Sequence, residues 1–154
     1  MKKRLVSVVG LVCLLGLVGG TVVANAGADI TSPETFTLVG TTIKDRFVDV
    51  GKQGNSPGDL IVFVNRLTDE TDTVVGKARI ECTAHIGQWA ICIGTFNITG
   101  RGEIVGEGMV PLGPDTTSFD VPVTGGTGDF SNVRGEVTVT PTDTGEADAF
   151  SLIP

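Results

Sequence analysis

Short runs rich in Val, Ile, Thr and Phe recur along this chain from residue 35 onward, and Gly, Pro, Asn and Asp bound each run. No window in this region carries a 3.6-residue apolar period, because glycine or proline interrupts every long stretch. β-branched and aromatic residues favour strands, whereas the bounding residues favour turns. The sequence therefore predicts an all-β chain of eight strands: 35–48, 59–68, 73–83, 88–98, 102–111, 117–124, 133–141 and 146–152.

Eight consecutive strands with short connections predict a single antiparallel barrel. The chain offers no crossover helix for a parallel sheet, and closure removes the exposed edges of an open sheet. An immunoglobulin-like sandwich is the alternative, but it needs a Trp between two widely spaced cysteines, and Trp89 lies near a predicted hairpin tip. The interior of an eight-stranded barrel holds packed side chains or one small ligand.

The first residues have the features of an export signal. Residues 1–4 are positively charged, and residues 5–23 are uncharged and mostly apolar. Small residues then suit cleavage after Ala26 or Ala28. A single membrane-spanning helix is the alternative, since the run approaches the ~20 residues that a span needs. Several glycines weaken that helix, and no basic cluster follows it.

We therefore expect a secretory signal peptide at 1–28 and one β-barrel domain at 29–154. The product would be extracellular, with no stable membrane anchor after cleavage. Cleavage would take the formal net charge from −7 to −10. Such an acidic balance, with no basic patch, argues against nucleic acid as a partner.

Cys82 and Cys92 are the only cysteines of the expected mature chain, and they flank a predicted hairpin tip at Gly87. Two cysteines in a secreted domain favour a disulfide, and directly opposed residues of an antiparallel pair lie within bridging distance. Two thiols alone make a poor zinc site. No other spacing indicates a metal or a cofactor, so none is expected.

Glycine is densest in the segment Val121–Val137, between two predicted strands, at Gly125, Gly126, Gly128 and Gly135. Such density indicates φ > 0 or a close backbone approach, as at a tight barrel corner. The segment resembles the Gly-Gly-Thr-Gly-x-Phe-x-x-x-Arg-Gly signature of the dirigent proteins, with Arg134 as its arginine. The allene oxide cyclases have the similar Thr-Gly-Gly-Ala-Gly-x-Phe. The resemblance implies a small barrel that holds an apolar, reactive ligand.

A second segment, Gly58-Asp-Leu-Ile-Val-Phe-Val-Asn-Arg-Leu67, resembles the Gly-Asp-Leu-x-x-Phe-x-Asn-x-Leu of the allene oxide cyclases. In that family the Phe and Asn line the pocket, and the Asn holds a water that binds the substrate oxygen. The resemblance makes Phe63 and Asn65 ligand-binding residues and Asn65 the candidate catalytic residue. Residues two apart on a strand face the same side, so Val62 and Val64 should face outward.

The first strand departs from the allene oxide cyclase pattern. Gly40 stands where that family has a Glu that stabilises the developing cation. Allene oxide cyclase activity itself is therefore not expected. Dirigent proteins use barrel aspartates and an arginine instead, for which Asp45, Asp59 and Arg134 are the candidates. Only Arg134 lies inside a matching motif, so it is the third predicted ligand-binding residue.

The remaining ionisable residues carry no motif and are interpreted as solvated. His85 belongs to the predicted hairpin, and Glu146 and Asp148 follow a predicted turn. Asp129 and Arg134 flank one corner, where they form either a surface ion pair or part of the pocket.

The resemblance implies a secreted barrel that binds a small apolar molecule and steers its cyclisation or coupling, an isomerase- or cyclase-like activity that works by restraint. The alternatives are a non-catalytic carrier or scavenger of such a compound, and an exported structural or interaction module. Several convergent polar groups inside the barrel would favour catalysis. A smooth apolar cavity would favour a carrier, and a filled interior would favour a structural or interaction module. The resemblance also implies a homo-oligomer, a dimer or trimer.

Overall fold

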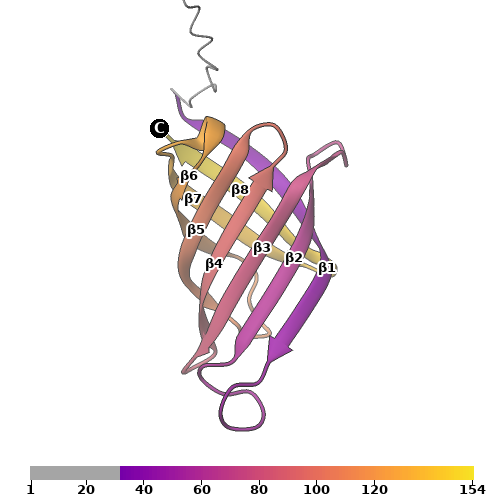
Figure 1. Cartoon of the computed structure of the whole chain (residues 1–154), viewed down its shortest axis with the longest axis vertical. Helices are drawn as coiled ribbons and strands as arrows, with labels where there is room; N and C mark the ends of the chain where they lie inside the picture. Colours follow the sequence, from indigo (N-terminus) through magenta and orange to yellow (C-terminus); the bar gives the residue numbers. More distant parts are fainter. Residues whose placement is uncertain (1–31) are drawn as a thin grey trace, which may run out of the picture.

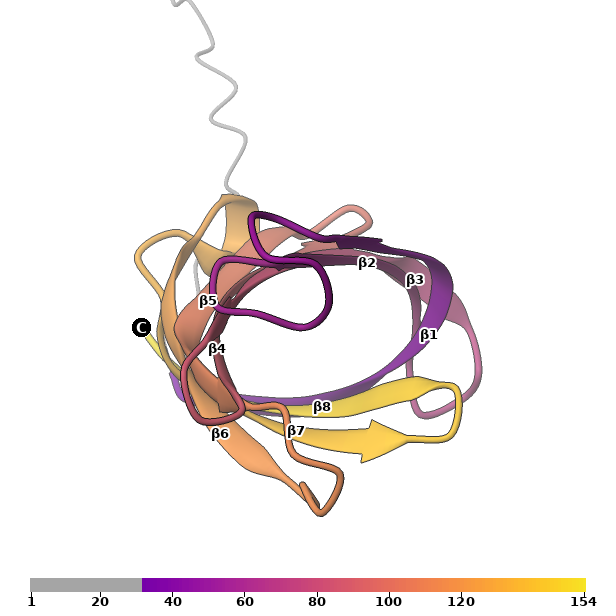
Figure 2. The ribbon, with the colours of Figure 1, turned by 90° about the horizontal axis from the view of Figure 1, so that it is seen from below.

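The computed structural model describes residues 32–154, so the predicted signal peptide lies outside the described residues. Its strands close into one antiparallel barrel in sequence order, with the last strand paired to the first (Figures 1 and 2). The strands are β1 (Glu34–Val48), β2 (Leu60–Thr68), β3 (Val74–His85), β4 (Trp89–Ile98), β5 (Gly102–Pro111), β6 (Phe119–Gly126), β7 (Arg134–Thr142) and β8 (Gly145–Ile153). Each predicted strand is confirmed, with its ends displaced by no more than two residues.

Side chains alternate between the barrel interior and the outer surface. On β4, Ala90, Cys92, Gly94 and Phe96 are buried, whereas the alternate residues Ile91 and Ile93 are exposed. This two-residue period places one face of every strand in a shared apolar core. Among the described residues, no helix is long and apolar enough to cross a membrane.

The upper end of the barrel in Figure 1 is filled by phenylalanines from four elements. The Phe36 and Phe150 rings stack with centroids 5.0 Å apart, Phe96 meets Phe150 edge-on at 5.1 Å, and Phe130 lies 6.3 Å from Phe36. Phe130 belongs to η1 (Gly128–Phe130), a single 3₁₀ turn between β6 and β7. These rings close this end of the interior.

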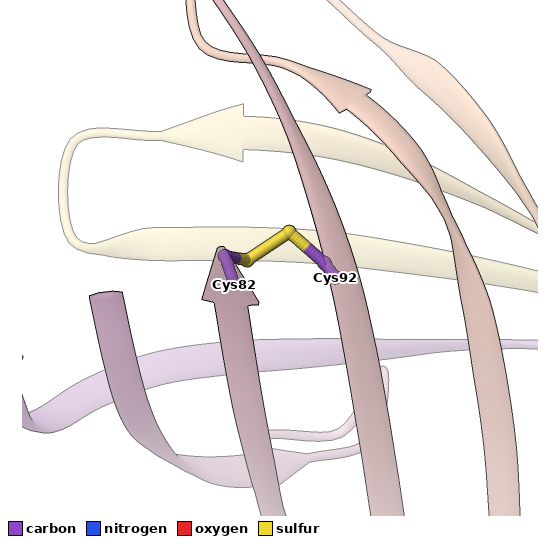
Figure 3. Close-up of a disulfide and its surroundings, with 2 residues drawn as sticks. All are labelled: Cys82 and Cys92. Carbon is purple, nitrogen blue, oxygen red and sulfur yellow. A yellow bond between two sulfur atoms is a disulfide. The ribbon is translucent and has the colours of Figure 1, made fainter. Parts of the chain in front are cut away.

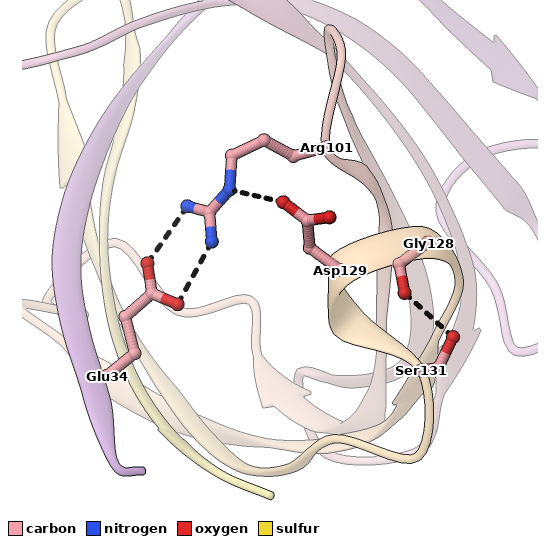
Figure 4. Close-up of polar contacts among 5 residues, drawn as sticks. All are labelled: Glu34, Arg101, Gly128, Asp129 and Ser131. Carbon is pink, nitrogen blue, oxygen red and sulfur yellow. Dashed lines mark hydrogen bonds and ion pairs between the residues drawn. The ribbon is translucent and has the colours of Figure 1, made fainter. Parts of the chain in front are cut away.

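Arg101 lies over this aromatic cluster. Its guanidinium is 4.5 Å from the Phe130 ring centroid and donates to both carboxylate oxygens of Glu34, at 2.9 and 3.0 Å. Its Nε also donates to Asp129 Oδ2 at 3.3 Å (Figure 4). Asp129 therefore pairs with Arg101, and the expected pair with Arg134 is not formed.

The glycine corner is tight for two reasons, as predicted. Gly128 and Gly135 have φ of +64° and +136°, which side chains rarely tolerate. Gly126 has an ordinary φ, but an added Cβ would lie 2.5 Å from the Glu103 carbonyl oxygen and 2.6 Å from that of Phe130. Gly125 has room, since the nearest atom to its added Cβ is Arg134 Nη1 at 3.7 Å. The corner therefore needs glycine at three of the four predicted positions.

Cys82 and Cys92 are directly opposed in the β3–β4 ladder and form the predicted disulfide (Figure 3). Both residues are buried in the core. The bridge therefore fastens two adjacent strands of the barrel wall on its inner side.

The lower end in Figure 1 carries the loop between β1 and β2, which passes across the opening in Figure 2. Asp59 holds this loop: its Oδ1 accepts from the Val50 amide at 2.8 Å and its Oδ2 from the Ser56 amide at 2.6 Å. These hydrogen bonds lower the pKa of Asp59. Asp59 therefore fixes the conformation of this loop.

Candidate functional site

A cavity of about 160 Å³ lies inside the barrel and is bounded on one side by Phe96 of the phenylalanine cluster. Its wall is apolar apart from two carboxyl groups at one side, those of Glu146 and Asp148. The aromatic part of the wall consists of Phe63, Phe96 and Phe119, and the disulfide Cys82–Cys92 also contributes. The remaining lining residues are Ile80, Gly94, Gly106, Val110, Pro111, Leu112, Val121, Val137 and Val139.

A wider hollow of about 610 Å³ lies at the end of the barrel that carries the β1–β2 loop, here called the lower mouth, and residues of that loop and of the β3–β4 turn line it. Phe47, Ile86 and Leu112 are among its apolar lining residues. Leu112 lines both this hollow and the internal cavity, so the two spaces meet at its side chain. The internal cavity is therefore adjacent to the lower mouth of the barrel.

Asp148 is completely buried, and neither of its carboxyl oxygens has a hydrogen-bond partner. Burial, with a further contribution from the neighbouring Glu146, raises the pKa of Asp148 to about 9. The Asp148 carboxyl is thus protonated at neutral pH and can donate as well as accept a hydrogen bond.

Glu146 lies two residues before Asp148 on β8 and faces the same interior. Burial raises the pKa of Glu146, and a hydrogen bond from Asn65 opposes that shift. The two carboxyls therefore both favour their protonated forms in a poorly solvated space, and a negative charge on Glu146 also raises the pKa of Asp148.

Asn65 projects from β2 to the same place and is 2% exposed. Its Nδ2 donates to Glu146 Oε1 at 2.8 Å, whereas its Oδ1 is buried without a partner. The predicted inward direction of Asn65 and Phe63 is confirmed, and Val62 and Val64 alternate to the outer side, where they are half-buried. Three buried polar atoms without partners, the Asn65 Oδ1 and both Asp148 oxygens, thus lie at one part of the interior.

The interpretation of Glu146 and Asp148 as solvated turn residues is wrong. β8 begins already at Gly145, and its alternate residues Glu146, Asp148, Phe150 and Leu152 all face inward. The two-residue period leading back from Phe150 and Leu152 was the signal that could have found them.

Gly40 on β1 explains why the site has no carboxylate from the first strand. It is paired with Glu146 across the β1–β8 ladder, and an added Cβ at Gly40 would lie 3.2 Å from Glu146 Cγ and 3.3 Å from Asn65 Nδ2. The interior carboxyl next to Gly40 belongs instead to Glu146, on the neighbouring strand β8.

Arg134 lies outside the cavity, on the exposed start of β7. Its Nη1 donates to the carbonyl oxygen of Val133 at 2.7 Å. His85 lines the lower hollow instead. Within residues 32–154, no group of three or more His, Cys, Asp and Glu side chains could hold a metal ion.

No protein-family model and no curated protein sequence matches the chain. Among solved structures, a pyocyanin demethylase is 27% identical, with a TM-score of 0.69 over 78% of this chain and 100% of that one. A pterocarpan synthase dirigent protein is 18% identical, with a TM-score of 0.57 over 79% and 92% of the two chains. AbnU, an exo-specific intermolecular Diels-Alderase, is 16% identical, with a TM-score of 0.57 over 79% and 98%.

The fold and the cavity therefore define a dirigent-like β-barrel with an internal polar site. The resemblance seen in the glycine-rich segment is confirmed at the level of the fold, which dirigent proteins and cyclisation-promoting barrels share.

Proposed function

We propose that this barrel binds a small, mostly apolar molecule in its central cavity and steers the cyclisation or coupling of that molecule. The observation that carries this proposal is the buried Asp148 carboxyl, which has no hydrogen-bond partner and lines a cavity that is apolar apart from Asp148 and Glu146. Asn65, the hydrogen-bond partner of Glu146, has a further buried oxygen without a partner. Unpartnered buried polar groups cost stability, and a bound polar group would satisfy them.

The chemistry would combine restraint with proton transfer. An apolar wall around a small cavity limits the conformations of a bound molecule, which removes entropy from the barrier of a ring closure. The protonated Asp148 can donate a proton to a polar atom that gains charge in the reaction, and Glu146 can accept one. Asn65 fixes the Glu146 carboxylate through its 2.8 Å hydrogen bond.

Convergent polar groups favour catalysis over a carrier role, by the criterion drawn from the sequence. A carrier of an apolar compound has no use for two buried carboxyls, each of which is costly to keep. A purely structural module would have no cavity of about 160 Å³ beside them.

The test is to identify what co-purifies with the exported protein and then to follow its conversion by mass spectrometry. Asp148→Asn should reduce turnover at least ~100-fold, as loss of a general acid does. Asn65→Ala should also reduce turnover, because it removes the hydrogen bond that fixes Glu146. Glu107→Gln, on the exposed outer side of β5, is the matched control and should retain full activity. Full turnover by both site variants would contradict the proposal.

Removal of a methyl group from a small molecule is a second candidate reaction. The similarity to the pyocyanin demethylase favours it, since 27% of residues are identical over the whole of that chain. Incubation with pyocyanin and mass spectrometry of the products would distinguish this reaction from a cyclisation. An unchanged pyocyanin sample would exclude pyocyanin as the substrate.

We also propose that the mature protein is exported and self-associates. Export rests on the sequence features of residues 1–28. Self-association is supported by Ile91 and Ile93 on β4 and Met109 on β5, which form an exposed apolar patch on the outer wall.

A further inference from the structure

The cavity wall carries acidic side chains but no basic ones. Glu146 and Asp148 are the only titratable side chains among its lining residues. Along β8 their strand neighbours are uncharged: Gly40 and Pro141 flank Glu146, and Leu38 and Val139 flank Asp148. Asn65, the hydrogen-bond partner of Glu146, is also neutral. No side chain of the described cavity wall therefore balances a negative charge on the pair.

The basic side chains of the neighbouring strands point elsewhere. Arg66 and Arg79 alternate with the inward-facing Asn65 and Ile80 and so face outward. Arg101 is held by Glu34 and Asp129 at the upper end (Figure 4).

A further carboxyl group comes from β1, near the end of that strand that leads into the β1–β2 loop. Asp45 is opposite the inward-facing Phe63 in the β1–β2 ladder, which places Asp45 on the inner side of the barrel wall. Asp45 is exposed and therefore solvated. Asp45 thus adds a carboxyl to the inner side of the wall, although it is not among the residues that line the cavity or the lower hollow.

The aromatic residues of the cavity wall, like its carboxyl groups, favour a bound cation. Phe63, Phe96 and Phe119 line the cavity together with the two carboxyls. The faces of aromatic rings attract cations, and this attraction is strongest where water is excluded. A buried carboxylate likewise gains most from a cation in a poorly solvated space.

We infer that the ligand of this cavity is a compact organic cation, a protonated amine or an N-alkylated aromatic nitrogen, whose charge lies beside Glu146 and Asp148. The inference rests on the proposed small-molecule function and specifies its substrate class. Such a cation would supply the positive charge that the cavity wall lacks, and its apolar body would contact the phenylalanines and the disulfide.

The test compares three probes of nearly equal shape: N-methylquinolinium, the neutral 1-methylnaphthalene and the anionic 1-naphthoate. Their binding to the mature protein is measured by fluorescence at pH 7. We expect the cation to bind at least ~10-fold more tightly than the neutral probe, and the anion to bind more weakly than both. Equal or tighter binding of the neutral probe would overturn the charge inference and leave the small-molecule function standing.

A second readout uses the protonated state of Asp148, which a merely structural role would not change. A cation beside the pair lowers its pKa, so binding should release up to about one proton. Calorimetry of N-methylquinolinium binding in phosphate and in Tris would measure this release. The neutral probe should release none. Absence of proton release with a bound cation would place the cation away from Asp148 and overturn the inference.

Glu146→Gln removes one charge with little change in shape. It should abolish the preference for the cation over 1-methylnaphthalene, whereas Glu107→Gln on the outer wall should preserve it. A preference that survives Glu146→Gln would contradict the inference. Binding of none of the three probes to the folded wild-type protein would count against the proposed small-molecule function as well, which separates that failure from a failure of the charge inference.

Discussion

Gly40 and Glu146 are paired across the β1–β8 ladder, and the Glu146 side chain lies over the bare backbone of Gly40. The contact leaves no free space for a methyl group: an added Cβ would lie 3.2 Å from Glu146 Cγ and 3.3 Å from its Oε1. The position of one of the two interior carboxyls is thus set by the absence of a side chain on the adjacent strand.

Gly40→Ala should displace Glu146 and break its 2.8 Å hydrogen bond from Asn65. Because hydrogen bonds to charged groups contribute about 1.5–3 kcal/mol, we expect ligand affinity or turnover to fall at least ~10-fold. The melting temperature should change little, since the displaced atoms belong to side chains that can move. Gly125→Ala is the control. Wild-type ligand affinity and turnover in the Gly40→Ala variant would show that neither quantity depends on the position of Glu146.

The stability of the fold should fall as the pH rises from 5 to 8. The raised pKa of Asp148, about 9, means that the folded state keeps a proton that the unfolded state loses above its ordinary pKa of 3.8. Stability from this group is therefore complete below about pH 4 and declines up to about pH 9. The raised pKa of Glu146 acts in the same direction. The pKa values of Asp59 and Asp69 are lowered, so these two residues lose their contribution to the stability of the fold only at acid pH.

Asp148→Asn isolates this effect, because an amide does not titrate in this range. As the pH rises from 5 to 8, the free energy of unfolding of the variant should increase relative to that of the wild type by on the order of 1 kcal/mol or more. Thermal unfolding followed by circular dichroism at both pH values measures the difference. Parallel pH profiles for the two proteins would mean that Asp148 is ionised in the folded state.

Loss of the disulfide should destabilise the barrel without unfolding it. The bridge closes a short loop, for which the expected contribution is about 2–3 kcal/mol. Replacing both Cys82 and Cys92 by Ala, followed by denaturant titration, tests this value. Mass spectrometry of the wild type purified in oxidising conditions should show the two cysteines joined, and free thiols there would contradict the pairing.

Gly126→Val should destabilise the barrel by about 2 kcal/mol or more, because the new side chain overlaps backbone atoms that cannot easily move. Its added Cβ would meet the carbonyl oxygens of Glu103 and Phe130. Gly125→Ala, one residue earlier, has room and should unfold like the wild type. Equal melting temperatures for all three proteins would show that the corner tolerates side chains.

The apolar patch of Ile91, Ile93 and Met109 predicts a dimer or trimer in light scattering. Ile93→Glu should yield a monomer, because burying an unpaired carboxylate in an interface is costly. Val74→Glu, a substitution at an exposed residue elsewhere on the wall, should leave assembly unchanged. A monomeric wild type would mean that the patch serves another purpose.

The strands and the bridge could be predicted from the sequence because their signals are local. Glycine and proline mark the turns, and the spacing of Cys82 and Cys92 around one hairpin determines their pairing. Asn65 was found by motif. Glu146 and Asp148 were missed because their burial depends on closure of β8 onto β1, a contact between residues about 100 positions apart. Arg101, which replaces Arg134 as the partner of Asp129, depends on a similarly distant contact.

The phenylalanine cluster and Arg101 close one end of the barrel, whereas the internal cavity meets the hollow at the other end. The internal cavity therefore opens at one end of the barrel only. Two reactants of a coupling would have to pass the same opening in succession, the first would sit deeper than the second, and the product would have to leave before the next turnover began. Steady-state kinetics with two substrates should accordingly show a compulsory order of addition, with the deeper reactant binding first.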